Sequence, residues 1–391
     1  MARLARPVAT GAAALQSSSR EGRNLQDAKI GGAGILPDTA IQQLIVDGAV
    51  MMAMAPAENQ VQPASLDLRL GAKATRVRAS FLPGPDFSVS QKLAQLGLHE
   101  FPLTGGAVLE TGCVYIVPLL ENLALPGDIA ASANPKSSTG RLDVFTRVIT
   151  DKARAFDKMT EGYSGPLFLE ISPRTFPILV RTGSRLSQIR FRRGGALLDD
   201  RALGKLHAAE ILASGTPRFM DGLALSIDLE GDRDGLVGYR AKRYTGVIDV
   251  DKVAAHDVAD FWEPIHRRER AEIVLDPAQF YILVSAESVH VPALYAAEMV
   301  PFDPLVGEFR VHYAGFFDPG FGHAPAGGHG SRAVLEVRSH EVPFILEHGQ
   351  TIGRLVYEKM AKKPHSLYGA TLGSNYQAQG LKLSKHFRAP N

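Results

Sequence analysis

A polar segment at residues 136–141 has the chemistry of a phosphate-binding site. Its sequence is Lys-Ser-Ser-Thr-Gly-Arg, so six positions supply two cations, three hydroxyl groups and a glycine. Charge-assisted donors, hydroxyl donors and a backbone that permits close approach are what a phosphate chain needs. The alternative is a solvated polar turn without a ligand.

A second candidate for chemistry is Glu170, which interrupts the apolar run Leu167-Phe168-Leu169-Glu170-Ile171. The run has the length and composition of a largely buried strand. A carboxylate in such a strand must be paired or hydrogen-bonded, because desolvation of an isolated charge is costly. Glu170 is therefore either a general base for a nucleotide site or one half of a structural ion pair.

Composition limits the function classes. The chain has 391 residues, 45% hydrophobic and 21% charged, which is typical of a globular protein with room for two domains. The formal charge of +2 gives no support for a general nucleic-acid or anionic-membrane binder. No run of 18 apolar residues is present, so we expect no membrane span.

The single cysteine, Cys113, excludes an intramolecular disulfide and favours a reducing compartment, so we expect a cytoplasmic protein. It also bears on the chemistry. Zinc-dependent nucleobase deaminases hold their metal with a His or Cys and two further cysteines. If this chain deaminates a base, we expect it to do so without zinc bound by cysteines.

The chain contains an internal repeat. Glu121 and Glu287 lie in matching contexts, Tyr-Ile-Val-x-x-x-Glu and Tyr-Ile-Leu-Val-x-x-Glu, 166 positions apart. The same offset links Glu170 with Glu336 and Pro135 with Pro301. We therefore predict a tandem duplication, with a first unit at 35–215 and a second at 216–391, after an N-terminal tail at 1–34 that we exclude from the fold.

The two units differ where the first has its polar segment. The second unit has Phe-Asp-Pro-Leu-Val-Gly-Glu at 302–308, so the cations and hydroxyls are replaced by acids. It keeps a hairpin-like Phe-Asp-Pro-Gly-Phe-Gly at 317–322 and the Leu335-Glu336-Val337 strand. His323 and His329 could bind a metal, but a flexible loop without a third ligand is the stronger interpretation.

Short apolar runs separated by Gly, Pro and Asn dominate the chain and predict a mainly β sandwich or barrel with few helices. Asp38 is a candidate N-cap for a short helix that carries Ile41, Leu44 and Ile45, and 63–71 alternates as a half-buried strand does. No Walker phosphate loop and no Rossmann fingerprint is present. Trp262 is expected in the core. The tail at 366–391 carries aromatics and donors without a core pattern, so it is either a segment that folds over a ligand or a frayed terminus.

Together, 63–71, 136–141, Gly-Tyr-Ser-Gly at 162–165 with Leu169-Glu170, and Tyr368 to Gln379 resemble the dCTP deaminases, the metal-free deaminase branch of the dUTPase-like superfamily. The resemblance covers nearly the whole chain beyond residue 35 and is to the two-domain bacterial form. It implies tandem distorted β-barrel or jelly-roll domains, assembled as a homo-oligomer with pseudo-threefold domain rings and with active sites between adjacent domains.

The resemblance also implies site residues. Glu170, Ser137 and Arg141 match the family's catalytic residues, with Glu336 as second choice for the glutamate. Nucleotide contacts are implied for a further set: Lys136, Ser138, Thr139, Gly140, Asp157, Tyr163, Phe168, Leu169, Tyr368 and Gln379. Lys136 stands where the family usually has arginine, the hairpin after Asp157 is longer than usual, and Asn375 stands where a lysine is expected.

The implied reaction is zinc-independent hydrolysis of dCTP to dUTP and ammonia in pyrimidine deoxynucleotide synthesis. Mg²⁺ would be bound through the triphosphate rather than by side chains, and dTTP is a candidate inhibitor. Two alternatives stay open. One is a dUTPase or a bifunctional enzyme that ends at dUMP, and the other is a non-catalytic nucleotide-binding regulator.

Overall fold

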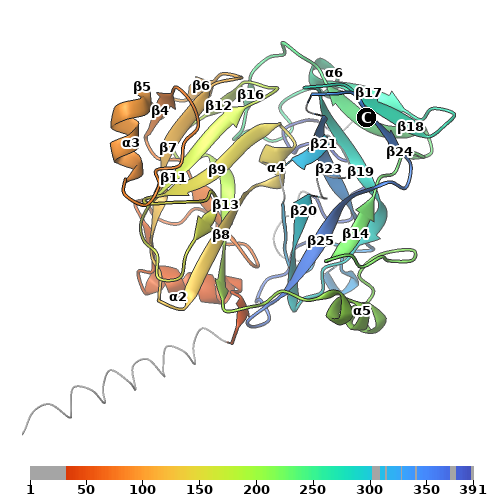
Figure 1. The fold of residues 1–391 in the computed structure, drawn as a ribbon, viewed down its shortest axis with the longest axis horizontal. Helices are drawn as coiled ribbons and strands as arrows, with labels where there is room; N and C mark the ends of the chain where they lie inside the picture. Colours follow the sequence, from red (N-terminus) through yellow and green to blue (C-terminus); the bar gives the residue numbers. More distant parts are fainter. Residues whose placement is uncertain are drawn as a thin grey trace, which may run out of the picture.

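The computed structural model describes residues 32–301, 309–312, 315–326, 328–339, 341–369 and 376–388. The expectation for residues 1–34 therefore lies almost wholly outside the described residues, as does that for the acidic segment 302–308. The chain forms two β-rich lobes that lie side by side (Figure 1). Among the described residues, no helix is long and apolar enough to cross a membrane.

The first repeat consists of strands with three short helices. In chain order the elements are β1 (Gly34–Ile35), α2 (Asp38–Val46), β2 (Val50–Met52), β3 (Leu66–Arg69), β4 (Lys73–Val77), α3 (Val89–Leu96), β5 (Gly97–Pro102), β6 (Ala107–Leu109), β7 (Val114–Ala124), β8 (Ile129–Pro135), α4 (Ser137–Gly140), β9 (Val144–Thr150), β10 (Lys158–Met159), β11 (Ser164–Pro173), β12 (Ile178–Val180) and β13 (Arg185–Arg193).

The second repeat has the same character. Its elements are α5 (Asp200–Ala209), β14 (Leu223–Ser226), β15 (Leu236–Ala241), β16 (Ile248–Asp249), α6 (Val258–Phe261), β17 (Trp262–His266), β18 (Glu272–Leu275), β19 (Phe280–Val289), β20 (Tyr295–Pro301), β21 (Phe309–His312), β22 (Phe316–Phe317), η2 (Ala324–Ala326), β23 (Ser331–Ser339), β24 (Phe344–Glu347) and β25 (Thr351–Lys359).

The sheets confirm the predicted mainly β fold and show the duplication. In repeat one the strand orders are β1-β13-β8-β10, with β3 on β13, and β5-β4-β7-β11-β9, with β2 on β7. In repeat two the corresponding orders are β14-β25-β20-β22 and β17-β15-β19-β23-β21. The strands with the two Leu-Glu motifs, β11 and β23, are thus equivalent inner strands, each between two neighbours that satisfy its backbone.

The two repeats are joined by more than the linker between β13 and α5. Strand β16 of repeat two pairs in parallel with β12 of repeat one, through Ile178 and Ile248. One apolar core is built mainly from repeat one but includes Trp262, Phe280 and Phe387 of repeat two. Trp262 is 1% exposed, which confirms its predicted place in the core. The repeats therefore share packing, and a site between them has a fixed geometry.

The local predictions near the N-terminus are partly confirmed. The helix α2 buries Ile41 and Leu44, as the apolar spacing predicted. However, Asp38 is its first residue and Pro37 is the N-cap, with no side-chain cap. The Asp38 carboxylate instead accepts hydrogen bonds from the backbone N–H groups of His365 and Ser366, at 2.9 and 2.8 Å. The acid thus fixes the start of the C-terminal tail rather than capping the helix.

The end of the linker also differs from the sequence-based boundary. Helix α5, which that boundary placed in the first unit, buries Leu203 and Leu206 in the core of repeat two. Asp199 caps it by accepting a hydrogen bond from the N–H of Ala202 at 2.7 Å.

Candidate active site between the repeats

The polar segment 136–141 lies at the junction of the two repeats. Strand β8 ends at Pro135, and the backbone then makes the single helical turn α4, in which the N–H groups of Thr139 and Gly140 both donate to the carbonyl of Lys136. These two amides are therefore already used within the turn. The side chains of Lys136, Ser137 and Ser138 open into a cavity of about 340 Å³, and Arg141 lines the same cavity.

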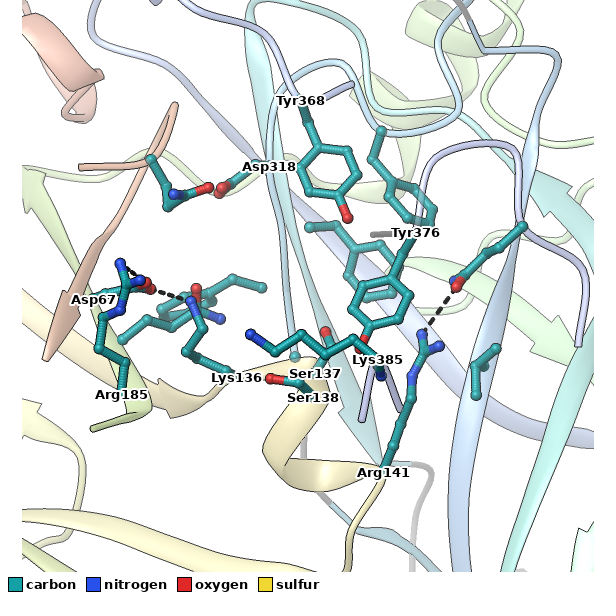
Figure 2. A pocket seen from close by; sticks show the side chains of 18 of the residues that line it. Asp67, Lys136, Ser137, Ser138, Arg141, Arg185, Asp318, Tyr368, Tyr376 and Lys385 are labelled. Atoms are coloured by element: carbon teal, nitrogen blue, oxygen red, sulfur yellow. Dashed lines mark hydrogen bonds and ion pairs between the residues drawn. The ribbon is translucent and has the colours of Figure 1, made fainter. Parts of the chain in front are cut away.

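One end of this cavity is positively charged. Lys136 forms an ion pair with the buried Asp67 of β3, and Arg185 of β13 approaches the other oxygen of that carboxylate at 3.4 Å (Figure 2). Lys385 of the C-terminal tail lies at the same end. Burial, with Lys136 and Arg185 as further causes, lowers the pKa of Lys385. Three cations here face two carboxylates, Asp67 and Asp251, so this end of the cavity favours an anion.

Arg141 connects this segment to the tail and to repeat two. Its guanidinium donates to the carbonyl of Lys382 at 2.8 Å and to Oε1 of Gln379 at 3.1 Å, and it stacks 4.0 Å from the ring of Tyr376. Its Nε is buried and has no hydrogen-bond partner among the described residues. The same Nε lies 3.9 Å from Oε1 of Glu336. A free donor therefore points into the region where a polar ligand atom would sit beside Glu336.

Glu336 is the carboxyl group of the cavity. It stands in the apolar strand β23, where alternation directs Val334 and Glu336 to the face that lines the cavity. Its side chain is 5% exposed. Burial raises the pKa of Glu336 to about 8, and the nearby charge of Arg141 opposes that rise. Near neutral pH this group exchanges a proton readily, as a general acid–base catalyst requires.

Repeat two also supplies a second acid and an apolar wall. Strand β22 and the segment after it place Phe317, Asp318 and Phe321 in the cavity lining, and Met299 lines it from β20. The rings of Phe317 and Phe321 meet edge to face, with centroids 5.0 Å apart. Burial raises the pKa of Asp318. An apolar wall with a few polar groups is the usual surrounding of a bound base or sugar.

The C-terminal tail closes the cavity. Ser384 donates from its Oγ to the carbonyl of Ser138 at 2.7 Å, and Tyr368, Tyr376 and Gln379 line the interior. Leu383 and Phe387 are buried in the core of repeat one, and the rings of Phe387 and Trp262 meet edge to face with centroids 6.0 Å apart. Of the two predictions for 366–391, the fold-over segment is therefore the one that the described part of the tail shows. Asn375 lies outside the described residues.

The structure brings together one part of the predicted set. The residues that line the cavity are Lys136, Ser137, Ser138, Arg141, Glu336, Tyr368 and Gln379. The others do not line it: Thr139, Gly140, Asp157, Tyr163, Phe168, Leu169 and Glu170.

Glu170 is held elsewhere, by an ion pair. It is 1% exposed, and its Oε1 accepts from both Nε and Nη2 of Arg147, at 3.0 and 2.6 Å. The Arg147 guanidinium is covered in turn by the ring of Phe156, 3.5 Å away. The sequence left open a base or a structural ion pair for Glu170, and this geometry is that of the ion pair.

The hairpin of repeat one shows why Asp157 lies outside the cavity. Ala133 and Met299 are equivalent positions, 166 residues apart. The N–H of Ala133 donates to the carbonyl of Asp157, and the N–H of Met299 donates to the carbonyl of Gly315. Asp157 therefore corresponds to Gly315, and the structural counterpart of Asp318 is Thr160. Asp157 has a local role, because its Oδ1 accepts from the N–H of Val148 at 2.7 Å. Burial raises its pKa to about 7.

Several lining residues were not among the predicted site residues: Asp67, Arg185, Gln188, Asp318, Phe321, Tyr376 and Lys385. Two signals could have found some of them. Asp67 lies in the Ser-Leu-Asp-Leu motif that the repeat analysis used, and Asp318 lies in the tight Phe-Asp-Pro-Gly-Phe-Gly turn. Arg185 and Gln188 come from a strand whose sequence alone gives no reason to face a ligand.

No metal-binding cluster accompanies the cavity: among the residues that the structure describes, no three His, Cys, Asp or Glu side chains come together as ligands would. His323 lies 3.9 Å from Glu210 instead.

Comparison with known proteins assigns the family. Residues 32–195 match the family model for the N-terminal domain of 2'-deoxycytidine 5'-triphosphate deaminase, and residues 199–387 match the model for its C-terminal domain. A crystal structure of that deaminase from Agrobacterium tumefaciens is 67% identical, with a TM-score of 0.82, and covers 85% of this chain and 99% of its own.

Curated relatives agree. A dCTP deaminase of Haloarcula marismortui is 30% identical over 163 residues, which are 40% of this chain and 79% of that protein. A dUMP-forming dCTP deaminase of Methanosphaera stadtmanae is 28% identical over 159 residues, 40% of this chain and 78% of that protein. The assignment rests on two domain models that match in tandem and on a solved relative that is matched over almost all of its length. The chain is an enzyme that belongs to the dCTP deaminase family.

Proposed function

We propose that the chain hydrolyses dCTP to dUTP and ammonia at the cavity between its repeats, with Glu336 as the proton carrier. One observation carries this proposal. A buried carboxyl group whose pKa is raised to about 8 lies in the same cavity as Lys136, Ser137, Ser138 and Arg141. The cations would hold the triphosphate, and the carboxyl group would serve the base. In this assignment Glu336 replaces Glu170, which was the first choice from sequence.

The triphosphate would occupy the end near Lys136, Arg185 and Lys385. The hydroxyl groups of Ser137 and Ser138 can donate to phosphate oxygens there. Asp67 keeps Lys136 and Arg185 in place before the nucleotide arrives. Mg²⁺ would enter bound to the phosphate oxygens and water, as it commonly does with nucleotides. The side chains fit that arrangement, since the two carboxylates at this end are already paired with cations, Asp67 with Lys136 and Arg185 and Asp251 with Arg181, rather than arranged as a ligand cage.

The base would lie near Glu336, Arg141 and the aromatic wall. With a pKa of about 8, the Glu336 carboxyl group is mostly protonated near neutral pH. It can donate its proton to N3 of cytosine, which makes C4 more electrophilic. The resulting carboxylate then takes a proton from water as the water oxygen bonds to C4.

The second half of the reaction returns that proton. Glu336 donates it to the amino group and the C4–N bond breaks. The former water oxygen gives its second proton to the Glu336 carboxylate as the C4 carbonyl forms, which restores the protonated group. The balance is dCTP and water to dUTP and ammonia. The Nε of Arg141, which has no hydrogen-bond partner among the described residues, and the hydroxyl of Ser137 would position the water and stabilise the charge that develops at C4.

The decisive experiment is incubation of the protein with dCTP and Mg²⁺, with ammonia and pyrophosphate measured separately. Ammonia without pyrophosphate supports the proposal. Ammonia with equal pyrophosphate would mean a bifunctional enzyme that ends at dUMP, as the name of the Methanosphaera relative says of that protein. A parallel incubation with dUTP completes the test: pyrophosphate from dUTP without ammonia from dCTP would mean a dUTPase, and binding without either product a regulator.

Independence from zinc is part of the same proposal, and it is motivated by the single cysteine. Turnover should survive a chelator that removes transition metals, once Mg²⁺ is restored. Loss of turnover that only zinc reverses would refute this part alone.

A further inference from the structure

A buried charge pair joins the two repeats at the edge of the cavity. Arg190, in the middle of β13, is fully buried and reaches from repeat one to Asp318 of repeat two, with Nη2 3.1 Å from Oδ1. The same guanidinium donates to the carbonyl of Ala297 at 3.1 Å and lies 4.0 Å from the ring of Phe316. Arg190 does not line the cavity, but Asp318 does.

The pair determines the charge of Asp318. Burial raises the pKa of this carboxyl group, and Arg190 is the largest of the influences that lower it. Lys136 lowers it further, and Asp67 raises it. Without Arg190, the buried group would lose the partner that offsets its desolvation and would bind a proton more readily. A protonated carboxyl group is a poorer acceptor for a ligand, so Arg190 controls what Asp318 offers to the cavity.

The duplication provides an internal comparison. Arg190 pairs in register with Ser132 on β8, and 166 positions later Val356 pairs with Glu298 on β20. Val356 is therefore the counterpart of Arg190. The counterpart of Asp318 is Thr160, as the hairpin hydrogen bonds show. Both charges are thus absent from the equivalent positions of the other copy.

This asymmetry argues against a purely structural role. A buried ion pair is a weak source of stability compared with apolar residues of similar volume. The other copy folds with Val356 and Thr160 in these places. The charged pair occurs only on the face that also carries the Lys136 segment.

We propose that Arg190 is a positioning residue for the reaction: from the opposite repeat it holds the Asp318 carboxylate in place as a hydrogen-bond acceptor for a donor group of the nucleoside. Arg190 acts through Asp318 and does not touch the nucleotide. The inference rests on the proposed function for its substrate, dCTP, but its test is a binding measurement that does not need turnover.

The test uses Arg190→Met, which keeps a long apolar side chain and removes the charge, in a Glu336→Gln background that prevents both turnover and titration at 336. Calorimetry with dCTP and Mg²⁺ should show affinity at least about tenfold weaker at pH 7. The loss should shrink as pH is raised, because the Asp318 carboxyl group then gives up its proton more readily. Arg190→Lys should restore part of the affinity. A structural defect alone would not produce this pH dependence.

Two controls make the test specific. Arg192, two positions along β13, also reaches repeat two, with Nη2 3.1 Å from Oε1 of Glu358, but lies outside the cavity lining. Arg192→Met should leave dCTP affinity unchanged. In an Asp318→Asn background, Arg190→Met should cause no further loss, because residues that act as a unit are not additive.

If Arg190→Met alone does not fold, the inference can still be tested by comparing Asp318→Asn with the double variant Asp318→Asn, Arg190→Met. The double variant leaves no uncompensated buried charge, so we expect it to fold. Unchanged affinity in Arg190→Met at all pH values, or a full additional loss in the Asp318→Asn background, would overturn the inference. Ammonia release by the wild-type enzyme is measured in parallel. If it is absent while the binding results hold, the proposed function fails and only the role of Arg190 in nucleotide binding stands.

Discussion

Replacement of Glu336 by Gln separates chemistry from packing, because Gln keeps the shape and most hydrogen bonds but cannot carry a proton. If Glu336 is the proton carrier, kcat should fall by roughly a hundredfold or more, the usual scale for a general acid–base group. The KM for dCTP should change little, since the phosphate end of the cavity is unaltered. Steady-state ammonia release measures both.

The same substitution should have a distinctive effect on stability. The pKa of Glu336 in the folded protein, about 8, lies above its ordinary value of 4.5. Folding therefore favours the protonated group: its stabilising effect is complete below pH 4.5 and is lost as pH rises through about 8. Relative to wild type, Glu336→Gln should gain on the order of 3–5 kcal/mol between pH 4.5 and 8.5. Urea unfolding at a series of pH values measures this gain.

The matched control is Glu170→Gln, at the equivalent place on β11. Glu170 is just as buried, but it is held by two hydrogen bonds from Arg147. Its loss should leave kcat within a few-fold of wild type. It should cost about 1–3 kcal/mol of stability, less than for a fully buried pair because the Arg147 side chain is 25% exposed. The two variants thus differ in their effect on kcat and have opposite effects on stability.

Loss of turnover in Glu170→Gln, with Glu336→Gln still active, would refute the assignment and move the reaction to a site built around repeat one. Equal losses would mean that both glutamates work.

Three further variants test the surroundings. Arg141→Lys keeps the charge but loses the forked contacts to Lys382 and Gln379, so kcat/KM should fall at least about tenfold, whereas Arg147→Lys should not change it. Lys385→Met should raise the Kd for dCTP about tenfold and weaken its salt dependence. An unchanged Kd would exclude Lys385 from phosphate binding. Deletion of 366–391 is a poorer test because it removes Leu383 and Phe387 from the core. Asp157→Asn should leave the Kd for dCTP unchanged. Because the pKa of Asp157 is raised from 3.8 to about 7, the wild type should lose stability across that range and the variant should not, as unfolding measured from pH 4 to 8 would show.

The sequence was sufficient for the mainly β class, the duplication, the polar segment and the buried Leu-Glu strands. It was not sufficient to choose between Glu170 and Glu336. Their local contexts are nearly the same, and the difference lies in what packs against each: Arg147 from the neighbouring strand β9 in one case, and the cavity in the other.

The hairpin could not be aligned from sequence for a similar reason. Asp157 and Asp318 both follow a phenylalanine, so they look equivalent. The strand pairing aligns Lys158 with Phe316 and Met159 with Phe317, so Asp157 and Asp318 lie three positions out of register. Likewise, Arg185, Arg190 and Lys385 lie far from the 136–141 segment in sequence and reach the site only through tertiary packing.

We expect one nucleotide site in each chain, because the face around Glu170 is closed. Around Glu170, the Arg147 guanidinium also binds Oγ of Ser80 at 2.7 Å and stacks on Phe156. Phe81 and Phe156 pack on a small core that contains Phe168, so apolar side chains fill the space beside Glu170.

A nucleotide site at the face around Glu170 would take its phosphate ligands from repeat two. The segment of repeat two that corresponds to 136–141, residues 302–308, has acids and no cation. Titration of the Glu336→Gln protein with dCTP and Mg²⁺ should therefore saturate at one nucleotide per chain. Glu170→Gln, which loosens Arg147, should not add a second. Two equivalents per chain in either variant would show that the face around Glu170 can open to a nucleotide, and that repeat one carries a site of its own.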